Sequence, residues 1–320
     1  MNINRGLLFW GLALVVGGAT ALAVQLDYID RDVLLDAWRL WPVILIVLGL
    51  AIILGRTPYG WLGTVAAALV VGIAGGVMLS IGPGSFTCGG PEPTVLEEHD
   101  GTFGGSSAEV NLEFNCGTLE VGMGGGSDWQ AAVGSTDEDN PPRVTESASA
   151  LTIRSPDEPF FGGGRQRWEL TLGSDVSYDL NVSPNAASVD LDLGGGTFSR
   201  IGLSPNAGDI GLALDGATVD ELRVSANAVN VGITVDGGSS VSGRMNANAG
   251  SLQLCAAPDT ALRLTMNDSV AFRHNLDDSE LDRSGDTWTT EGYESADNQV
   301  ELTVEGNAAS FTLNPEGGCG

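Results

Sequence analysis

Histidine is the side chain that most often moves protons at neutral pH, and this chain of 320 residues contains two. His99 precedes the β-rich part of the sequence, His274 lies in a stretch rich in Asp, and the two share no obvious partner. The chain has no GxSxG, P-loop or HExxH motif. We therefore expect both histidines on the surface, and we predict no catalytic residue and no cofactor.

Carboxylates are abundant, and they suggest two further kinds of chemistry. Paired carboxylates cleave glycosidic bonds, and Asp190 and Asp192 are such a pair in the sequence. They alternate with apolar residues, however, so strand geometry already places both on an outward face. Residues 275–280 offer oxygen ligands for Ca²⁺, but their spacing does not match an EF-hand loop. A solvated loop is the simpler interpretation, and no metal site is predicted.

All four cysteines lie after the apolar N-terminal region. An even number in an exported domain indicates two disulfides, for which three connectivities exist, and four free thiols in a cytoplasmic domain are the alternative. No CxxC pair or neighbouring histidine indicates a zinc site. We favour the pairing that staples each end of the β-rich region, which is Cys88 with Cys116 and Cys255 with Cys319.

The chain is strongly acidic. Its 14 basic residues are all arginines, against 41 Asp and Glu, and the formal net charge is −27. Such a surface repels phosphate groups, so nucleic acid is not an expected partner. The charge would suit cations or cationic peptides, although keeping a Gly-rich domain soluble is a sufficient reason for it.

The first 82 residues or so are nearly all apolar. Runs at residues 6–25, 40–55 and 61–81 are candidate membrane-spanning helices, although the second is short. Their edges carry aromatic residues that suit the membrane interface, namely Trp38, Trp41, Tyr59 and Trp61. We therefore expect about three transmembrane helices over residues 1–82, in a lipid bilayer, and a linker over residues 83–103.

The few charges near these runs indicate the orientation. Arg5 and Arg56 are basic residues that no acidic neighbour opposes, and the positive-inside rule places both in the cytoplasm. Everything after Ser80 would then be extracytoplasmic, in agreement with the position of the cysteines. Alternatively, the first run is a cleaved signal peptide, because Ala21-Leu22-Ala23 resembles a cleavage site. The C-terminal domain would lie on the same side in either case.

A 21-residue repeat runs through the second half of the chain, marked by an Asn-Ala pair. The asparagines are Asn185, Asn206, Asn227 and Asn248. Two apolar columns follow the same period, one with Val189, Ile210, Val231 and Leu252, the other with Leu191, Leu212, Ile233 and Leu254. Apolar and polar residues alternate within each unit, which predicts two short strands separated by a Gly-containing turn and by the Asn-Ala turn.

Stacked units of this kind form one continuous core, so the repeat predicts an all-β, β-solenoid domain over residues 104–320. With strands about 4.8 Å apart, equivalent asparagines lie above one another and can hydrogen-bond along the stack. We interpret them as a structural ladder and not as a binding site. Residues 108–114, 118–121 and 168–172 are predicted strands of the same type. Strands near 300–304 and 310–313 are predicted to cap the stack, and residues 137–143 and 157–167 are predicted loops.

Two segments resemble a known family. Leu40-Trp41-Pro42-Val43 and the apolar residues up to Leu50 resemble the signature of the LiaI/LiaF-like transmembrane region. Residues 108–121 are similar to the opening strands of the toast-rack domain, which is related to the LiaF-like C-terminal and adhesin-type β-domains. The resemblance implies a bacterial envelope protein, in some relatives an accessory regulator of an envelope-stress two-component system, and it implies no catalytic residues.

Three functional hypotheses remain. The first is a non-enzymatic sensor or regulator of envelope stress, whose partner would be a membrane histidine kinase or another envelope protein. The second is a surface adhesin or structural protein, and the third is a carbohydrate-active β-helix enzyme. The sequence shows no kinase, receiver or DNA-binding module, so signalling would need a separate partner.

Overall fold

The computed structural model describes residues 91–320 except 138–139, 157–163, 268–270, 317 and 319–320, together with a few helical residues between 11 and 71. The chain divides into two compact units near residue 86. The three predicted spans lie almost wholly outside the described residues. Within the described part, no helix is long and apolar enough to cross a membrane.

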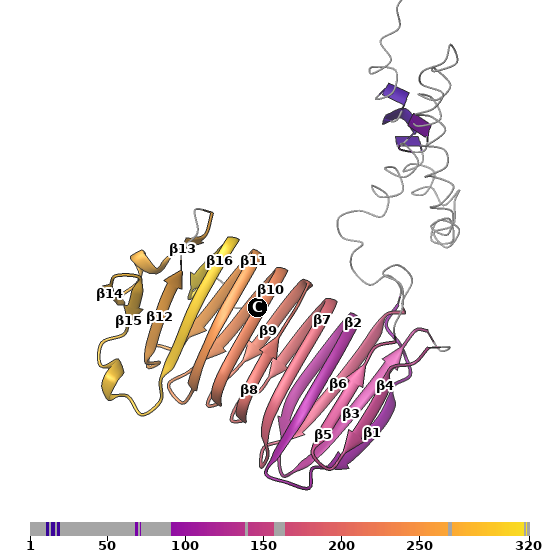
Figure 1. Cartoon of the computed structure of the whole chain (residues 1–320), viewed down its shortest axis with the longest axis horizontal. Helices are drawn as coiled ribbons and strands as arrows, with labels where there is room; N and C mark the ends of the chain where they lie inside the picture. The colour runs from indigo at the N-terminus through magenta and orange to yellow at the C-terminus, as the bar shows by residue number, and fades with distance from the viewer. Residues whose placement is uncertain are drawn as a thin grey trace, which may run out of the picture. The chain divides into compact units, whose positions relative to one another are not determined.

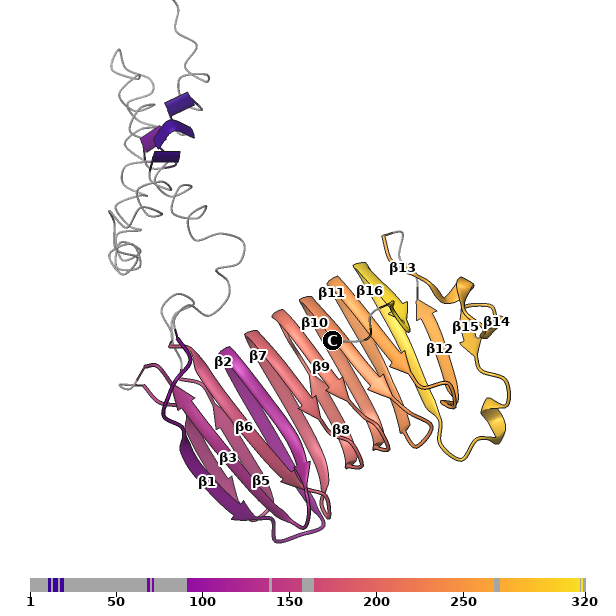
Figure 2. The same ribbon diagram turned by 180° about the vertical axis from the view of Figure 1, so that it is seen from behind.

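The second unit is a stack of β-strands that belong to one 16-stranded sheet (Figures 1 and 2). The strands are β1 (Glu97–Thr102), β2 (Ser107–Gly124), β3 (Asp128–Ser135), β4 (Arg143–Ser147), β5 (Ala150–Arg154), β6 (Gln166–Gly173), β7 (Ser177–Asp192), β8 (Thr197–Leu203), β9 (Ala207–Ala213), β10 (Thr218–Val235), β11 (Ser240–Ala256), β12 (Leu262–Asn267), β13 (Arg273–His274), β14 (Asp282–Ser284), β15 (Thr287–Thr289) and β16 (Val300–Leu313). Two short 3₁₀ helices, η2 (Leu276–Asp278) and η3 (Tyr293–Ser295), lie among the last strands.

Each long strand is a full rung of the stack with a corner in its middle. In β7, even-numbered residues are buried up to Pro184, whereas odd-numbered residues are buried from Ala187 on. The alternation changes phase at Asn185-Ala186, so the chain bends around the core at this pair. Hydrogen bonding to the next rung continues through the bend, where the amide of Asn206 donates to the carbonyl of Pro184 at 3.0 Å. The predicted Asn-Ala turn is therefore a corner within a strand, and a break in the strand separates β8 from β9.

A glycine makes the corner possible in some rungs. Gly208 of β9 follows the Asn206-Ala207 pair and has φ +122°, a conformation that other residues rarely adopt. A Cβ atom at this position would lie 1.9 Å from the carbonyl oxygen of Ala187 in the preceding rung. The backbones of the two rungs thus approach too closely at this corner for a side chain.

Parallel pairing converts the 21-residue period into the register of the stack. Val189 of β7 lies beside Ile210 of β9, which in turn lies beside Val231 of β10. All three side chains are buried, so successive rungs form one continuous core, as the repeat predicts. A tight turn closes each rung at its other end. The amides of Gly196, Ala217, Ser239 and Thr260 each donate to the carbonyl three residues earlier, at 2.9 to 3.1 Å.

The rungs at both ends of the stack depart from sequence order. β5 pairs with the first half of β2 and β6 with its second half, so β5 and β6 together form one rung. This rung follows β2 in the chain but lies on the outer side of it, while β7 lies on the inner side. At the other end, β12 and β13 form the rung that follows β11, and β16 is inserted between the two.

The predicted caps near residues 300–304 and 310–313 are therefore wrong. These residues form one strand, β16, which is paired on both sides and carries a buried apolar set. The stack ends on β3 and β1 at one end and on β15 and β14 at the other (Figure 1). β1 and β14 are short and polar, which suits an edge strand because such an edge resists pairing with other chains. Residues 97–102 of the predicted linker thus form β1.

Replacing Ile233 by Ala should lower the free energy of unfolding by about 2–5 kcal/mol, because the fully buried side chain leaves a cavity in a narrow core. Asp190→Ser is the matched control, since Asp190 is exposed on β7 and should change stability by less than about 0.5 kcal/mol. Thermal unfolding of the purified full chain measures both. Equal losses in the two variants would mean that the inward and outward faces are misassigned.

Candidate functional site

A ladder of asparagine side chains follows the corners of the rungs. Each Nδ2 donates to Oδ1 of the asparagine in the adjacent rung, at 2.7 to 2.9 Å. The members, in stacking order, are Asn115, Asn185, Asn206, Asn227, Asn248 and Asn307. The 21-residue repeat does not reveal the first and last members, because 70 and 59 residues separate them from their neighbours. The Asn-Ala pair at Asn307-Ala308 was the signal available in the sequence.

The ladder is exposed along most of its length, and its amides bond to one another. A net contribution of about 0.5–1.5 kcal/mol for each such bond, less where water competes, makes the ladder a device that fixes the register of adjacent corners. The first member also ties down the chain that follows β5. Nδ2 of Asn115 donates to the carbonyl of Pro156 at 3.1 Å, and the backbone N–H of Asn115 donates to Oγ of Ser155 at 2.9 Å.

The halves of the rungs before the corner present one outward face, which we call the first-half face. Two of its arginines are paired with acids of the domain. Arg200 lies 3.3 Å from Asp179 and 3.2 Å from Glu221, and Arg223 also binds Glu221. Hydrogen bonds from Arg223 and then from Arg200 lower the pKa of the Glu221 carboxyl. The charges on this face are largely balanced.

The halves after the corner present a second, different face, which we call the second-half face. Its outward residues are small and polar. One column contains Ser188, Asp209, Asn230, Ser251 and Ser310, and the next contains Asp190, Gly211, Gly232, Gln253 and Thr312. Within the first column, Asn230 donates to Asp209 and Ser251 donates to Asn230, both at 2.9 Å. From β7 to β16 this face carries no arginine, and its carboxylates are Asp190, Asp192 and Asp209, on β7 and β9.

The net charge of the protein belongs to the second unit. Residues 1–90 contain four Arg and four Asp, whereas residues 91–320 contain 10 Arg against 37 Asp and Glu. Arg200 and Arg223 of the first-half face are paired with acids, whereas Asp190, Asp192 and Asp209 of the second-half face have no arginine on that face from β7 to β16, so their negative charge is left unbalanced there. A flat, acidic surface of small side chains can contact a partner, but it encloses no reacting group.

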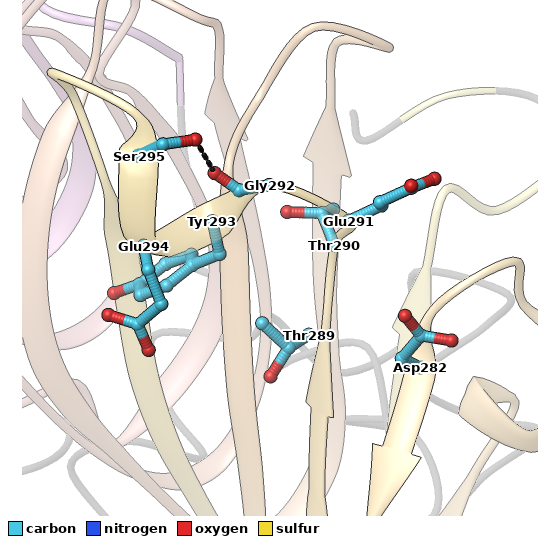
Figure 3. Close-up of a pocket in the computed structure, with 8 residues that line it drawn as sticks. All are labelled: Asp282, Thr289, Thr290, Glu291, Gly292, Tyr293, Glu294 and Ser295. Carbon is cyan, nitrogen blue, oxygen red and sulfur yellow. Dashed lines mark hydrogen bonds between the residues drawn. The ribbon is translucent and has the colours of Figure 1, made fainter.

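A shallow pocket of about 330 Å³ lies at the end of the stack that carries β14 and β15 (Figure 3). It is lined by Asp282, Thr289, Thr290, Glu291, Gly292, Tyr293, Glu294 and Ser295. Arg263 already contacts two of these residues. Its guanidinium carbon lies 4.1 Å from the centre of the Tyr293 ring, and its Nη2 forms an ion pair with Glu294. Burial raises the pKa of Tyr293. No histidine or cysteine is among the lining residues, and the pocket offers no paired nucleophile and base.

Two family models match the chain. The model of the LiaI-LiaF-like transmembrane region matches residues 8–53, and that of the N-terminal domain of toast-rack matches residues 94–234. The chain carries a LiaI-LiaF-like transmembrane region followed by a toast-rack domain. The toast-rack match begins just before β1 and ends within β10, so β11, β16 and the irregular end of the stack lie beyond it.

Solved structures similar to this chain have low sequence identity. A candidate cell adhesion protein from Clostridium sporogenes is 14% identical with a TM-score of 0.42, and the match covers 68% of this chain and 98% of that one. A candidate adhesin from Bacteroides fragilis is 10% identical with a TM-score of 0.28, covering 70% and 100%. No match was found among the curated proteins.

The two histidines lie at opposite ends of the stack, His99 within the toast-rack match and His274 beyond it. His99 belongs to the edge strand β1, with Nε2 4.0 Å from Glu97. His274 of β13 is half-buried, and its ring lies 5.0 Å from the Trp288 ring at 70°. It lies beside Phe311 in the register, so it continues a column of the core. His274 is thus partly exposed, as His99 is, but its ring packs against Trp288 and is not that of a free loop.

The candidate calcium loop is used for internal contacts. Asn275 donates to the carbonyl of Leu313 at 2.9 Å and accepts from its amide at 2.8 Å, while Asp277 pairs with Arg283 at 2.7 Å. Among the described residues, no group of three or more His, Cys, Asp and Glu could hold a metal ion.

Two of the four cysteines fall within the described residues, and neither Cys116 nor Cys255 is a free thiol. They cannot bond to each other. Cys116 of β2 is aligned with Ala249 of β11 through four rung steps, which is about 19 Å and far beyond the reach of a disulfide. Cys88 and Cys319 lie outside the described residues, so the pairing of Cys88 with Cys116 and of Cys255 with Cys319 stays a prediction.

Two aspartates in adjacent turns of the stack have opposite environments. Oδ1 of Asp236 accepts from the amides of Gly216 and Gly238, at 2.8 and 3.0 Å, and from Oγ of Ser239 at 2.8 Å. These bonds, the one from Gly216 foremost, lower the pKa of Asp236. Burial, followed by the charges of Asp236 and Asp192, raises the pKa of Asp215.

Asp236→Asn should lower the melting temperature at neutral pH, because the ionised carboxylate is the better acceptor for three donors. Since the pKa of Asp236 is lower in the folded state than the ordinary 3.8, its contribution is present above that pH and is lost as the pH falls below it. The difference between variant and parent should therefore shrink in acid. Thermal melts from about pH 3 to pH 7 measure it.

Asp215→Asn is the matched control. A raised pKa means that the ionised form of Asp215 costs stability at neutral pH, so the amide should leave the melting temperature unchanged or raise it. A larger loss from Asp215→Asn than from Asp236→Asn would contradict these assignments.

Proposed function

We propose that this toast-rack protein is a non-enzymatic, multi-pass membrane protein of the cell envelope, with its β-domain outside the cytoplasm. It acts as an accessory protein in sensing or regulating envelope stress. The observation that carries the proposal is the second-half face, which carries no arginine from β7 to β16 and whose acids, Asp190, Asp192 and Asp209, are exposed on β7 and β9. A membrane region joined to such a surface is suited to bind another protein and has no feature that suits turnover.

The stack supports this role because it is built to hold the face in one shape. Adjacent rungs are joined by parallel hydrogen bonds on both sides of the corner, and the asparagine ladder fixes the corner itself. A partner that contacts several rungs therefore meets columns of side chains at a constant spacing of about 4.8 Å. Such a surface is preorganised, so binding orders few additional groups.

Electrostatics indicates the kind of partner. An acidic face without basic residues attracts a protein surface that carries Arg or Lys, and complementary charge raises the rate of association. The partner we propose is the extracytoplasmic part of a membrane histidine kinase or of another envelope protein. Hydrolysis of glycans has less support, because Asp190 and Asp192 are exposed on a flat face and not in a cleft.

The topology can be tested by labelling. Ser225 is exposed on β10, and we expect Ser225→Cys to react with a membrane-impermeant maleimide in intact cells. Arg56→Cys, placed in the predicted cytoplasmic turn between two spans, should react only after lysis. The reverse pattern would place the toast-rack domain in the cytoplasm and refute this part of the proposal.

The partner can be tested by capture from membranes. Asp190→Arg together with Asp209→Arg reverses the charge of the second-half face, and we expect the captured amount of a co-purifying histidine kinase or envelope protein to fall at least about tenfold. Ser225→Arg adds one positive charge to the opposite face and should leave capture unchanged. Capture that is unaffected by the double variant would refute a role for the second-half face, and retention of glycans in place of a protein would favour an adhesin.

A further inference from the structure

β16 occupies a slot between two rungs that are consecutive in the chain. On one side it pairs with β11 along its whole length, and on the other side it pairs with β12 and β13. A single residue of β16 pairs with both neighbouring strands. Thr303 lies beside Arg244 of β11 on one side and beside Thr265 of β12 on the other. Without β16, the rung formed by β12 and β13 would face β11 directly.

The repeat makes that direct contact possible. Val241 and Met245 of β11 are followed 21 residues later by Leu262 and Met266 of β12, and all four are buried. This is the spacing that pairs adjacent rungs in the middle of the stack, for example Ile210 with Val231. A shift by one whole rung therefore leaves every inward residue of β12 inward, so no apolar residue of β12 is turned towards water.

The two ends of the stack differ in what their strand order requires. β2 precedes its neighbours in the chain, so the rung of β5 and β6 and the rung of β7 can add to its two free sides in turn. β16 follows β12 to β15 in the chain and yet lies between β11 and β12 in the sheet, so it separates two rungs that are consecutive in the chain.

We propose that the toast-rack domain has a second arrangement, in which β16 leaves the slot and β12 pairs directly with β11 in the 21-residue register. The exchange shortens the stack by one rung, about 4.8 Å, and releases a strand with an alternating apolar face. The slot is thus a two-state element whose populations a partner could shift by binding one arrangement better than the other. This inference does not depend on the proposed role in the envelope.

Pairs of introduced cysteines distinguish the arrangements in the full chain, kept in its membranes. Cysteines introduced by Arg244→Cys and Thr265→Cys lie two rungs apart, about 10 Å, while β16 is inserted. They become adjacent only when the slot closes. Arg244→Cys with Thr303→Cys are adjacent while β16 is inserted and report that state. Peptide mapping identifies each new disulfide against the native cysteines.

Asn181→Cys with Arg223→Cys form the matched control. They lie two rungs apart in the same column, on either side of Gly202, but the strand between them, β8, comes after β7 and before β10 in the chain, so it is joined to the rungs on both of its sides and cannot leave alone. Under mild oxidation we expect the Arg244/Thr265 pair to cross-link at least about tenfold faster than this control, because partial opening is less costly than unfolding the centre of the stack.

Equal rates for the Arg244/Thr265 pair and the control would overturn the proposal, and so would an Arg244–Thr265 disulfide found only between two copies of the chain. A chain that stops before Gln299 provides a second measurement. In it the slot has no strand to fill it, and the Arg244/Thr265 pair should cross-link almost completely. Failure to do so while the centre of the stack remains resistant to protease would also overturn the proposal.

Discussion

In-register parallel stacking is the constraint on which the toast-rack domain depends, because it brings equivalent side chains of successive rungs to within about 5 Å of each other. This stacking stabilises the apolar columns by packing. It also stabilises the asparagine ladder, because each side-chain amide is both a hydrogen-bond donor and an acceptor. Like charges at equivalent positions of adjacent rungs would instead repel each other and destabilise the stack. On the second-half face the acids are accordingly separated, since Asp190 is followed by Gly211 and Gly232, and Asp209 is followed by Asn230. Asp215 and Asp236 depart from this rule, and the charge of Asp236 adds to burial, the larger cause, in raising the pKa of Asp215.

The ends of the stack follow from the same constraint. A terminal rung presents unpaired backbone groups, so the strand placed there must tolerate water and resist pairing with other chains. β2 and β16 have the full apolar pattern of a rung and would be poor edges. Their exchange with neighbouring rungs gives both a partner on each side, and it leaves short, polar strands outside. It also links residues far apart in the chain, as the bond between Asn248 and Asn307 shows, so the ends are less independent than in a simple linear repeat.

The sequence predicts what is periodic in the structure and not what interrupts the period. The spacing of Asn206 and Asn227 is enough to infer the register, the inward columns and the ladder. It contains nothing about the position of β16, because Met266 continues the period from Met245 even though Val304 lies between them in space. The place of His274 in a strand is missed for a related reason. A run rich in Asp and Gly suggests a loop, whereas pairing with β16, which places His274 against Trp288, is a tertiary effect.

The distribution of charge gives the two outward faces different roles. On the first-half face each of Arg200 and Arg223 is bound to an acid of the domain, so an approaching basic surface would have to displace an existing ion pair. On the second-half face from β7 to β16 no arginine of the domain pairs with the carboxylates. Their neighbouring side chains are small and leave the carboxylates accessible. A basic partner therefore gains more by docking on the second-half face, and this preference weakens as salt screens the unbalanced acids.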